Sequence, residues 1–163
     1  MTQREVLGWD RFGTAGRELA QTIASDGFRP DGILAIARGG LLLAGALSYA
    51  LEIKDVYLMN VLFYSGVDER LATPVVLDPV PDAADLAGRS ILIVDDVADT
   101  GGTLQVVRDL YAGHLADSRI AVLYEKPRSA VKCDYVWRDT DLWIDFPWSS
   151  QPPVTGSGAA PAA

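Results

Sequence analysis

The segment Ile91–Leu104, which reads ILIVDDVADTGGTL, holds the densest group of side chains that could do chemistry. Asp95 and Asp96 directly follow four aliphatic residues. Two adjacent carboxylates at the end of an apolar strand repel each other and are costly to bury without partners. They are suited to bind sugar hydroxyls, or a cation that prefers oxygen ligands. We therefore interpret the pair as a ligand-binding feature.

A glycine turn follows three residues later. Asp99 precedes Thr100, Gly101, Gly102 and Thr103. The two glycines allow a tight turn and a close approach of the backbone to a ligand. The helix expected next points its free N–H groups at the same place, and the two threonines add hydroxyl donors. This turn is suited to hold a phosphate monoester.

The sequence DTGGT taken alone fits a capped helix start equally well. The combination is more specific, because an aliphatic strand, an acid pair, a third acid, two glycines and two threonines occur in order. We therefore favour the binding interpretation for the whole segment.

The surrounding elements alternate between strand and helix. Trp9–Ser25 has apolar residues at helical spacing, with Asp10 as its expected cap. Further helices are expected over Leu41–Leu51, as a buried helix, and Thr103–Leu115. Strands are expected at Ile33–Ala37, Val56–Phe63, Val75–Leu77, Ile91–Val94, Ile120–Tyr124, Tyr135–Trp137 and Leu142–Ile144. This alternation predicts an α/β fold, a mostly parallel twisted sheet flanked by helices, with ligands bound at the carboxyl ends of the strands.

Composition limits the class of protein. The chain has 163 residues, of which 49% are hydrophobic, as expected for a single domain over residues 1–150. Residues 151–163 are almost all Pro, Gly, Ser, Thr and Ala, which predicts a disordered tail. The net charge of −8 argues against nucleic-acid and anionic-membrane partners. A single cysteine and a polar N-terminus favour a cytoplasmic protein.

The sequence VDDVADTGGT resembles the phosphoribosyl diphosphate (PRPP) signature of type I phosphoribosyltransferases. Four further stretches resemble the 6-oxopurine branch of that family and fall in its order along the chain, namely Trp9–Asp10, Ala37–Leu41, Glu125–Pro127 and Trp143–Trp148. The resemblance implies the family fold with a small C-terminal hood. It also implies Mg²⁺, PRPP and a purine base as ligands, a nucleoside monophosphate product, and a homodimer or homotetramer.

The resemblance assigns a role to each matching residue on the PRPP side. Asp95 and Asp96 would hold the ribose hydroxyls, and residues 100–103 the 5-phosphate. Arg38 and Gly39 match the diphosphate loop, where an arginine fork and open backbone amides suit a diphosphate. Asp96 is the first choice for contact with Mg²⁺ or its waters. Asp99 would lie near the imidazole ring of the purine and act in proton transfer there.

Base recognition is expected over residues 124–148. The resemblance places Lys126 against the exocyclic oxygen of the base, and a lysine, which has only donors, suits a 6-oxo rather than a 6-amino group. Trp143 would stack on the purine, with the Ile144 backbone at its edge. Residues 64–73 match the family's lid, and Arg70 within it is a candidate PRPP contact.

The sequence does not fit two other classes of protein. A receiver domain would carry the acid pair at its first strand, and a P-loop hydrolase needs a Gly-Lys-Ser or Gly-Lys-Thr that is absent. Two alternatives stay open. The base could be adenine, orotate or another ring, and the chain could be a non-catalytic PRPP- or nucleotide-binding regulator of the same fold.

Overall fold

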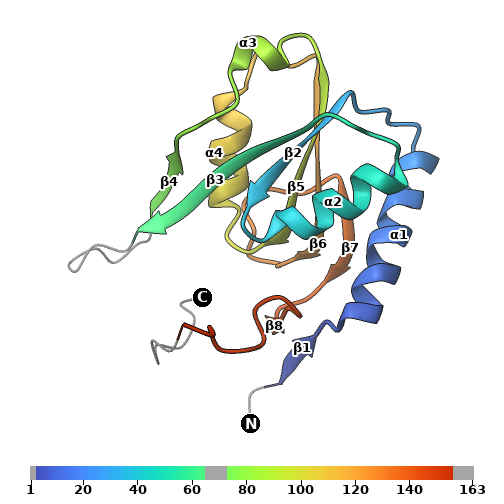
Figure 1. Cartoon of the computed structure of the whole chain (residues 1–163), viewed down its shortest axis with the longest axis vertical. Helices are drawn as coiled ribbons and strands as arrows, with labels where there is room; N and C mark the ends of the chain where they lie inside the picture. Colours follow the sequence, from blue (N-terminus) through green and yellow to red (C-terminus); the bar gives the residue numbers. More distant parts are fainter. Residues whose placement is uncertain (1–2, 65–72, 156–163) are drawn as a thin grey trace.

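The protein is described by a computed structural model that covers residues 3–64 and 73–155. Within these residues one six-stranded sheet forms the centre of the molecule (Figure 1). Its strands lie in the order β4 (Thr73–Leu77), β3 (Val56–Tyr64), β2 (Gly32–Ala37), β5 (Ser90–Ala98), β6 (Asp117–Glu125) and β7 (Tyr135–Asp139). All neighbouring pairs are parallel except β3 with β4. The predicted α/β fold with a mostly parallel sheet is confirmed.

Helices cover both faces of this sheet (Figure 1). On one face lie α1 (Trp9–Ser25) and α2 (Gly40–Ala50), and on the other lie α4 (Gly102–Leu110) and the short α3 (Ala83–Leu86). The central strand β2 is buried along its whole length, and its residues alternate between the two apolar cores. A strand covered on both faces has no polar side, which explains the unbroken run ILAIA.

The helix α1 has the predicted bounds, and its apolar stripe of Phe12, Leu19 and Ile23 packs into the core. The predicted cap is wrong. Gly8 is the N-cap residue and makes no side-chain cap, whereas Asp10 lies in the first turn of the helix. A carboxylate there still interacts favourably with the helix dipole.

A second, two-stranded sheet lies beyond the carboxyl ends of the main strands (Figure 1). It pairs β1 (Arg4–Val6) in parallel with β8 (Trp143–Asp145). The expected C-terminal hood therefore contains an N-terminal strand that sequence patterning did not predict. Three residues are too few for a periodicity signal.

The strands β4, β6, β7 and β8 differ from prediction by one to three residues at an end, and larger differences concern two boundaries and the burial of one helix. The strand β5 continues four residues past Val94 to Ala98, because its backbone stays paired with β6. The helix α4 ends at Leu110 rather than Leu115. The helix α2 is only half-buried, since Leu41, Leu42 and Tyr49 are exposed.

Two predicted segments lie partly or wholly outside the described residues. These are the lid at 64–73, of which 65–72 are not described, and the tail, of which only 151–155 are described, without helix or strand. No helix among the described residues is both long enough and apolar enough to cross a membrane.

Candidate active site

The acid pair lies within the last residues of β5, between β2 and β6. The two carboxyl groups are partly buried, and Oδ1 of Asp95 accepts a hydrogen bond of 2.9 Å from the backbone N–H of Asp96. Burial raises the pKa of Asp95 well above its usual range, and repulsion from Asp96 raises it further. Burial also raises the pKa of Asp96 to about 6, although nearby hydrogen bonds partly offset this. A cation or hydroxyl donors would relieve this unfavourable charge.

The predicted diphosphate loop packs directly against the acid pair. A β-carbon on Gly39 would overlap the carboxyl group of Asp96, and one on Gly40 would overlap the carbonyl oxygen of Val94. Gly40 has to be glycine because the overlapping atoms are backbone, whereas a side chain at position 39 would displace the carboxyl group of Asp96. The peptide bond between Ala37 and Arg38 is cis, and the Arg38 side chain is exposed at the end of β2. The structure thus brings the Arg38–Gly39 loop and Asp96 together, as the predicted site requires.

The predicted phosphate loop turns at Gly101, whose φ of +84° is in the left-handed region. A β-carbon there would lie 2.7 Å from the backbone nitrogen of Val131, so this position requires glycine for two reasons. The helix α4 begins at the next residue, Gly102, whose N–H donates to the hydroxyl of Thr100 at 3.3 Å. Thr103 lies in the first turn of α4, where N–H groups are free to bind an anion.

Asp99 is exposed and forms an ion pair that the sequence did not predict. Both Nε and Nη2 of Arg128 donate to Oδ1 of Asp99, the first at 2.8 Å. Asp99 does not cap α4, because Gly101 is the N-cap residue. Arg128 lies in an irregular segment two residues after Lys126, and no pattern in the sequence marks it.

Lys126, the predicted base-recognition residue, is buried. Its backbone N–H donates to the carbonyl of Ala98 at 2.9 Å, which fixes the residue at the end of β5. Its ammonium group donates to the carbonyl of Leu142, next to Trp143. An ammonium group has three donors, so donors are left for the oxygen of a ligand. The structure therefore holds the Lys126 side chain against the segment that carries Trp143, the other residue predicted to contact the base.

The two remaining base-site candidates lie on β8. Trp143 is 50% exposed, so its ring is available for stacking, whereas Ile144 is buried and its strand pairs with β1. Trp148 stacks on Phe146 at 4.8 Å with a 13° interplanar angle. It also contributes a hydrogen bond that lowers the pKa of Asp96. The C-terminal segment therefore reaches the acid pair, which links β8 to the PRPP side of the site.

One predicted site residue falls in the part of the chain that the structure does not describe. Arg70 lies outside the described residues, so its predicted contact stays a prediction. Within the described parts of the chain, no three His, Cys, Asp or Glu side chains converge as a metal cluster. The acid pair suits Mg²⁺, which keeps several waters and shares few protein carboxylates with substrate oxygens.

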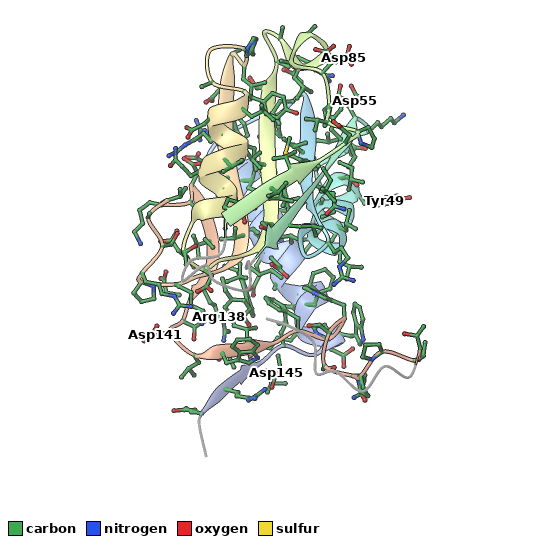
Figure 2. All side chains as sticks on the ribbon, turned by 90° about the vertical axis from the view of Figure 1, so that its left-hand side faces the viewer. Tyr49, Asp55, Asp85, Arg138, Asp141 and Asp145 are labelled. Carbon is green, nitrogen blue, oxygen red and sulfur yellow. The ribbon has the colours of Figure 1, made fainter. Side chains whose placement is uncertain are left out.

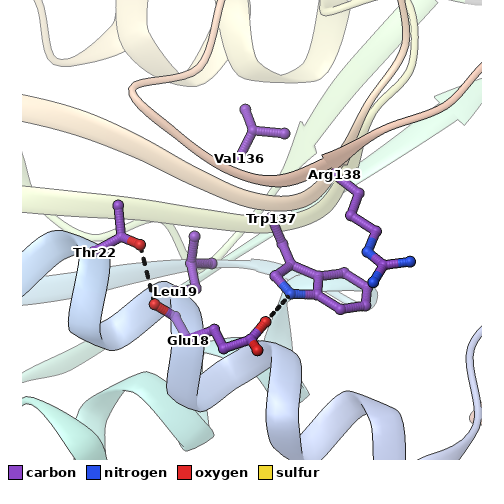
Figure 3. A pocket seen from close by; sticks show the side chains of 6 residues that line it. All are labelled: Glu18, Leu19, Thr22, Val136, Trp137 and Arg138. Atoms are coloured by element: carbon purple, nitrogen blue, oxygen red, sulfur yellow. Dashed lines mark hydrogen bonds between the residues drawn. The ribbon is translucent and has the colours of Figure 1, made fainter.

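A cavity of about 340 Å³ lies elsewhere, between α1 and β7 (Figure 3). Glu18 crosses it to accept a 2.7 Å hydrogen bond from the indole of Trp137, and Arg138 stacks on the same ring. Its lining includes none of the candidate site residues. We attribute no part of the proposed chemistry to it.

The fold and the site together define a class of protein. A parallel sheet carries an acid pair, a glycine turn and an arginine–glycine loop at one edge, which is the arrangement expected for binding a phosphorylated sugar diphosphate. Residues 2–153 match the phosphoribosyl transferase domain family. The chain belongs to this family.

Individual relatives are similar over nearly the whole chain. Xanthine-guanine phosphoribosyltransferase of Gluconobacter oxydans is 34% identical over 149 residues, covering 90% of this chain and 85% of the relative. The crystal structure of a purine phosphoribosyltransferase from Pyrococcus horikoshii is 35% identical, with a TM-score of 0.79, covering 93% and 97%. A Neisseria gonorrhoeae protein with bound ppGpp is 29% identical, with a TM-score of 0.75, covering 91% and 90%.

Proposed function

We propose that this protein transfers the 5-phosphoribosyl group of PRPP to a 6-oxopurine base in purine salvage. One observation carries the proposal: the buried ammonium group of Lys126 donates to the carbonyl of Leu142, next to Trp143, and its backbone N–H donates to Ala98, on the strand that carries the acid pair. The names of similar proteins, xanthine-guanine and purine phosphoribosyltransferases, support a purine as acceptor. The reaction joins C1 of the ribose to a base nitrogen and releases diphosphate.

The residues on the PRPP side would bind and orient the sugar. Asp95 and Asp96 accept hydrogen bonds from the ribose hydroxyls, and the turn at Gly101 with the first turn of α4 binds the 5-phosphate. The Arg38–Gly39 loop binds the diphosphate. Mg²⁺, held chiefly through Asp96 and substrate oxygens, would offset the charge on the leaving diphosphate. The proposed cation would therefore bind where the Arg38–Gly39 loop approaches Asp96.

The residues on the base side would set specificity and move a proton. Lys126 donates a hydrogen bond to the exocyclic oxygen of a 6-oxopurine. A 6-amino group is itself a donor, so it could not accept this hydrogen bond. Trp143 stacks on the ring. Asp99 accepts the proton that the base loses as the bond to C1 forms and the bond from C1 to the diphosphate oxygen breaks. We expect this reaction in the reducing cytoplasm.

A panel of bases tests the proposal. Wild-type protein, PRPP and Mg²⁺ are incubated with hypoxanthine, guanine, xanthine, adenine or orotate, and diphosphate release is measured. We expect release with at least one 6-oxopurine and loss of activity when EDTA removes the metal. Turnover with adenine or orotate alone would refute the base assignment.

A second candidate function is nucleotide-dependent regulation. The similar Neisseria gonorrhoeae protein was solved with bound ppGpp, a guanine nucleotide that carries two diphosphate groups. The same loops that suit PRPP could bind such a ligand here. Titration of ppGpp into the diphosphate-release assay distinguishes the possibilities. Competition with PRPP places the nucleotide in this site, whereas ppGpp binding by a protein that turns over no base identifies a regulator.

We also propose that two copies of the chain form a dimer through an apolar surface on α2 and β3. This surface consists of Leu41, Leu42, Tyr49, Val56 and Leu58, all at least 39% exposed. Tyr49, 90% exposed, projects away from the body of the molecule (Figure 2). Two copies that each carry a net charge of −8 repel, so a surface of apolar side chains is where they can approach most closely.

A further inference from the structure

The segment Lys126–Val131 forms one wall of the phosphate loop. The backbone N–H of Lys126 donates to the carbonyl of Ala98, and that of Ala130 donates to the carbonyl of Thr100, each at 2.9 Å. Gly101 approaches the same segment closely, since a β-carbon there would lie 2.9 Å from the hydroxyl oxygen of Ser129. Contacts before and after Arg128 therefore hold its backbone at the edge of the loop.

The side chain of Arg128 is less constrained than its backbone. In the ion pair with Asp99, the arginine side chain is 62% exposed and the aspartate side chain 49% exposed. Ion pairs exposed to this extent contribute little to stability, because solvent screens the attraction and two long side chains must be ordered. The pair can therefore open at small cost if a stronger acceptor comes within reach.

A phosphate monoester is such an acceptor. At neutral pH it carries nearly two negative charges and three acceptor oxygens, whereas the Asp99 carboxylate carries one charge. The planar fork of arginine binds phosphate through two hydrogen bonds at once. Asp99 directly precedes Thr100, the first residue of the phosphate loop, so a guanidinium group at Asp99 is already beside the place where the phosphate would bind.

We propose that Arg128 is an additional phosphate-binding residue that exchanges partners. In the free protein it pairs with Asp99, and when PRPP binds it turns to the 5-phosphate. The exchange leaves the Asp99 carboxylate without its cation, so the residue proposed to accept the proton of the base is released only when the sugar phosphate is in place. This inference rests on the proposed function, which places the 5-phosphate in the loop.

The test measures binding of ribose 5-phosphate by calorimetry, without base, diphosphate or Mg²⁺. Arg128→Ala should weaken binding about 10- to 100-fold, the range for losing hydrogen bonds to a charged group. Arg128→Lys, which keeps the charge but loses the fork, should be intermediate. Arg108→Ala removes an exposed arginine on α4 that bonds only Gln105 among the described side chains, and it should bind like wild type.

A double-mutant cycle tests the exchange of partners itself. Asp99→Asn removes the competing carboxylate, so it should tighten binding of ribose 5-phosphate a few-fold when Arg128 is present. In the Arg128→Ala background the same change should have a smaller effect. Equal tightening in both backgrounds would exclude the exchange, and wild-type affinity in Arg128→Ala would refute any phosphate contact.

These outcomes are separable from the proposed function. Failure of the wild-type protein to bind ribose 5-phosphate overturns the inference. Binding that depends on Arg128, together with no diphosphate release for any base, supports the inference while refuting the enzyme assignment.

Discussion

At the scale of single residues, Asp95 and Asp96 are unfavourable for the stability of the protein without ligand but suited to binding one. Burial raises the pKa of both carboxyl groups, so their charged forms are unfavourable in the protein without ligand. A substrate with hydroxyl donors and a cation would remove that penalty. Unfavourable charge at this edge of the sheet is what a binding site for such a ligand requires.

Asp96→Asn should lower diphosphate release by roughly 100-fold or more, because it removes the charge that would meet Mg²⁺ and ribose. The free energy of unfolding without ligand should not fall, since the wild-type carboxylate is disfavoured by burial. Steady-state assays and urea unfolding of the same samples check both statements. Unchanged activity would remove Asp96 from the site.

Lys126→Met keeps the length of the side chain and removes its donors. The KM for the base should rise about 10- to 100-fold, because the hydrogen bond from a charged group to the exocyclic oxygen is lost. The KM for PRPP should change little. Kinetics with each substrate varied in turn provides the measurement, and a rise confined to PRPP would place Lys126 outside the base site.

At the scale of elements, most of the helices and strands could be predicted because their apolar patterns are local. The stripe Phe12, Leu19 and Ile23 requires a helix, and the run Ile33–Ala37 requires a strand covered on both faces. The end of β5 could not be predicted. The apolar run ends at Val94, where Asp95 and Asp96 begin, so the sequence predicts that the strand ends there. The strand continues to Ala98 because its backbone stays paired with β6.

The parts of the candidate site that lie within one short motif could be predicted from sequence. The parts that depend on contacts between distant residues could not. The glycine turn could be predicted because it follows an aliphatic strand and an acid pair within one short segment. The close approach of Gly39 to Asp96 joins residues far apart in sequence, and so does the pairing of β1 with β8. The ion pair of Arg128 with Asp99 gives no sequence signal, because exposed arginines are common.

Gly101→Ala tests how the phosphate loop depends on its turn. A β-carbon there meets the backbone of Val131 in addition to the strain of a positive φ. Gly113→Ala is the matched control, because Gly113 has a φ of +79° and open space around it. The control should lose about 1 kcal/mol of unfolding free energy, and Gly101→Ala should lose more and bind ribose 5-phosphate more weakly. Equal losses in urea unfolding would mean that the contact with Val131 is unimportant.

At the scale of the whole molecule, acid stability depends on buried carboxylates such as Glu125. Burial tends to raise its pKa, but hydrogen bonds from Lys132 Nζ and the Cys133 N–H, both 2.8 Å, prevail and lower it. A lowered pKa contributes stability that is complete above the unfolded-state pKa and is lost as pH falls through the folded-state pKa.

Glu125→Gln should therefore lower the free energy of unfolding by about 1–3 kcal/mol at pH 7, since it weakens two hydrogen bonds to a buried group. The difference from wild type should shrink as pH falls through the acidic range, where the wild-type carboxyl group also becomes neutral. Urea unfolding at a series of pH values measures this difference. A difference independent of pH would show that packing, rather than charge, accounts for the loss.

Association is the remaining property of the whole molecule, and we propose that the apolar surface on α2 and β3 mediates it. Tyr49→Asp adds a charge to that surface without disturbing the core, because the side chain is 90% exposed. Sedimentation velocity should show a dimer for wild type and a monomer for the variant. Leu110→Asp, on an exposed position of α4, is the control and should remain dimeric. A monomeric wild-type protein would refute the dimer. A dimeric Tyr49→Asp would place the interface elsewhere.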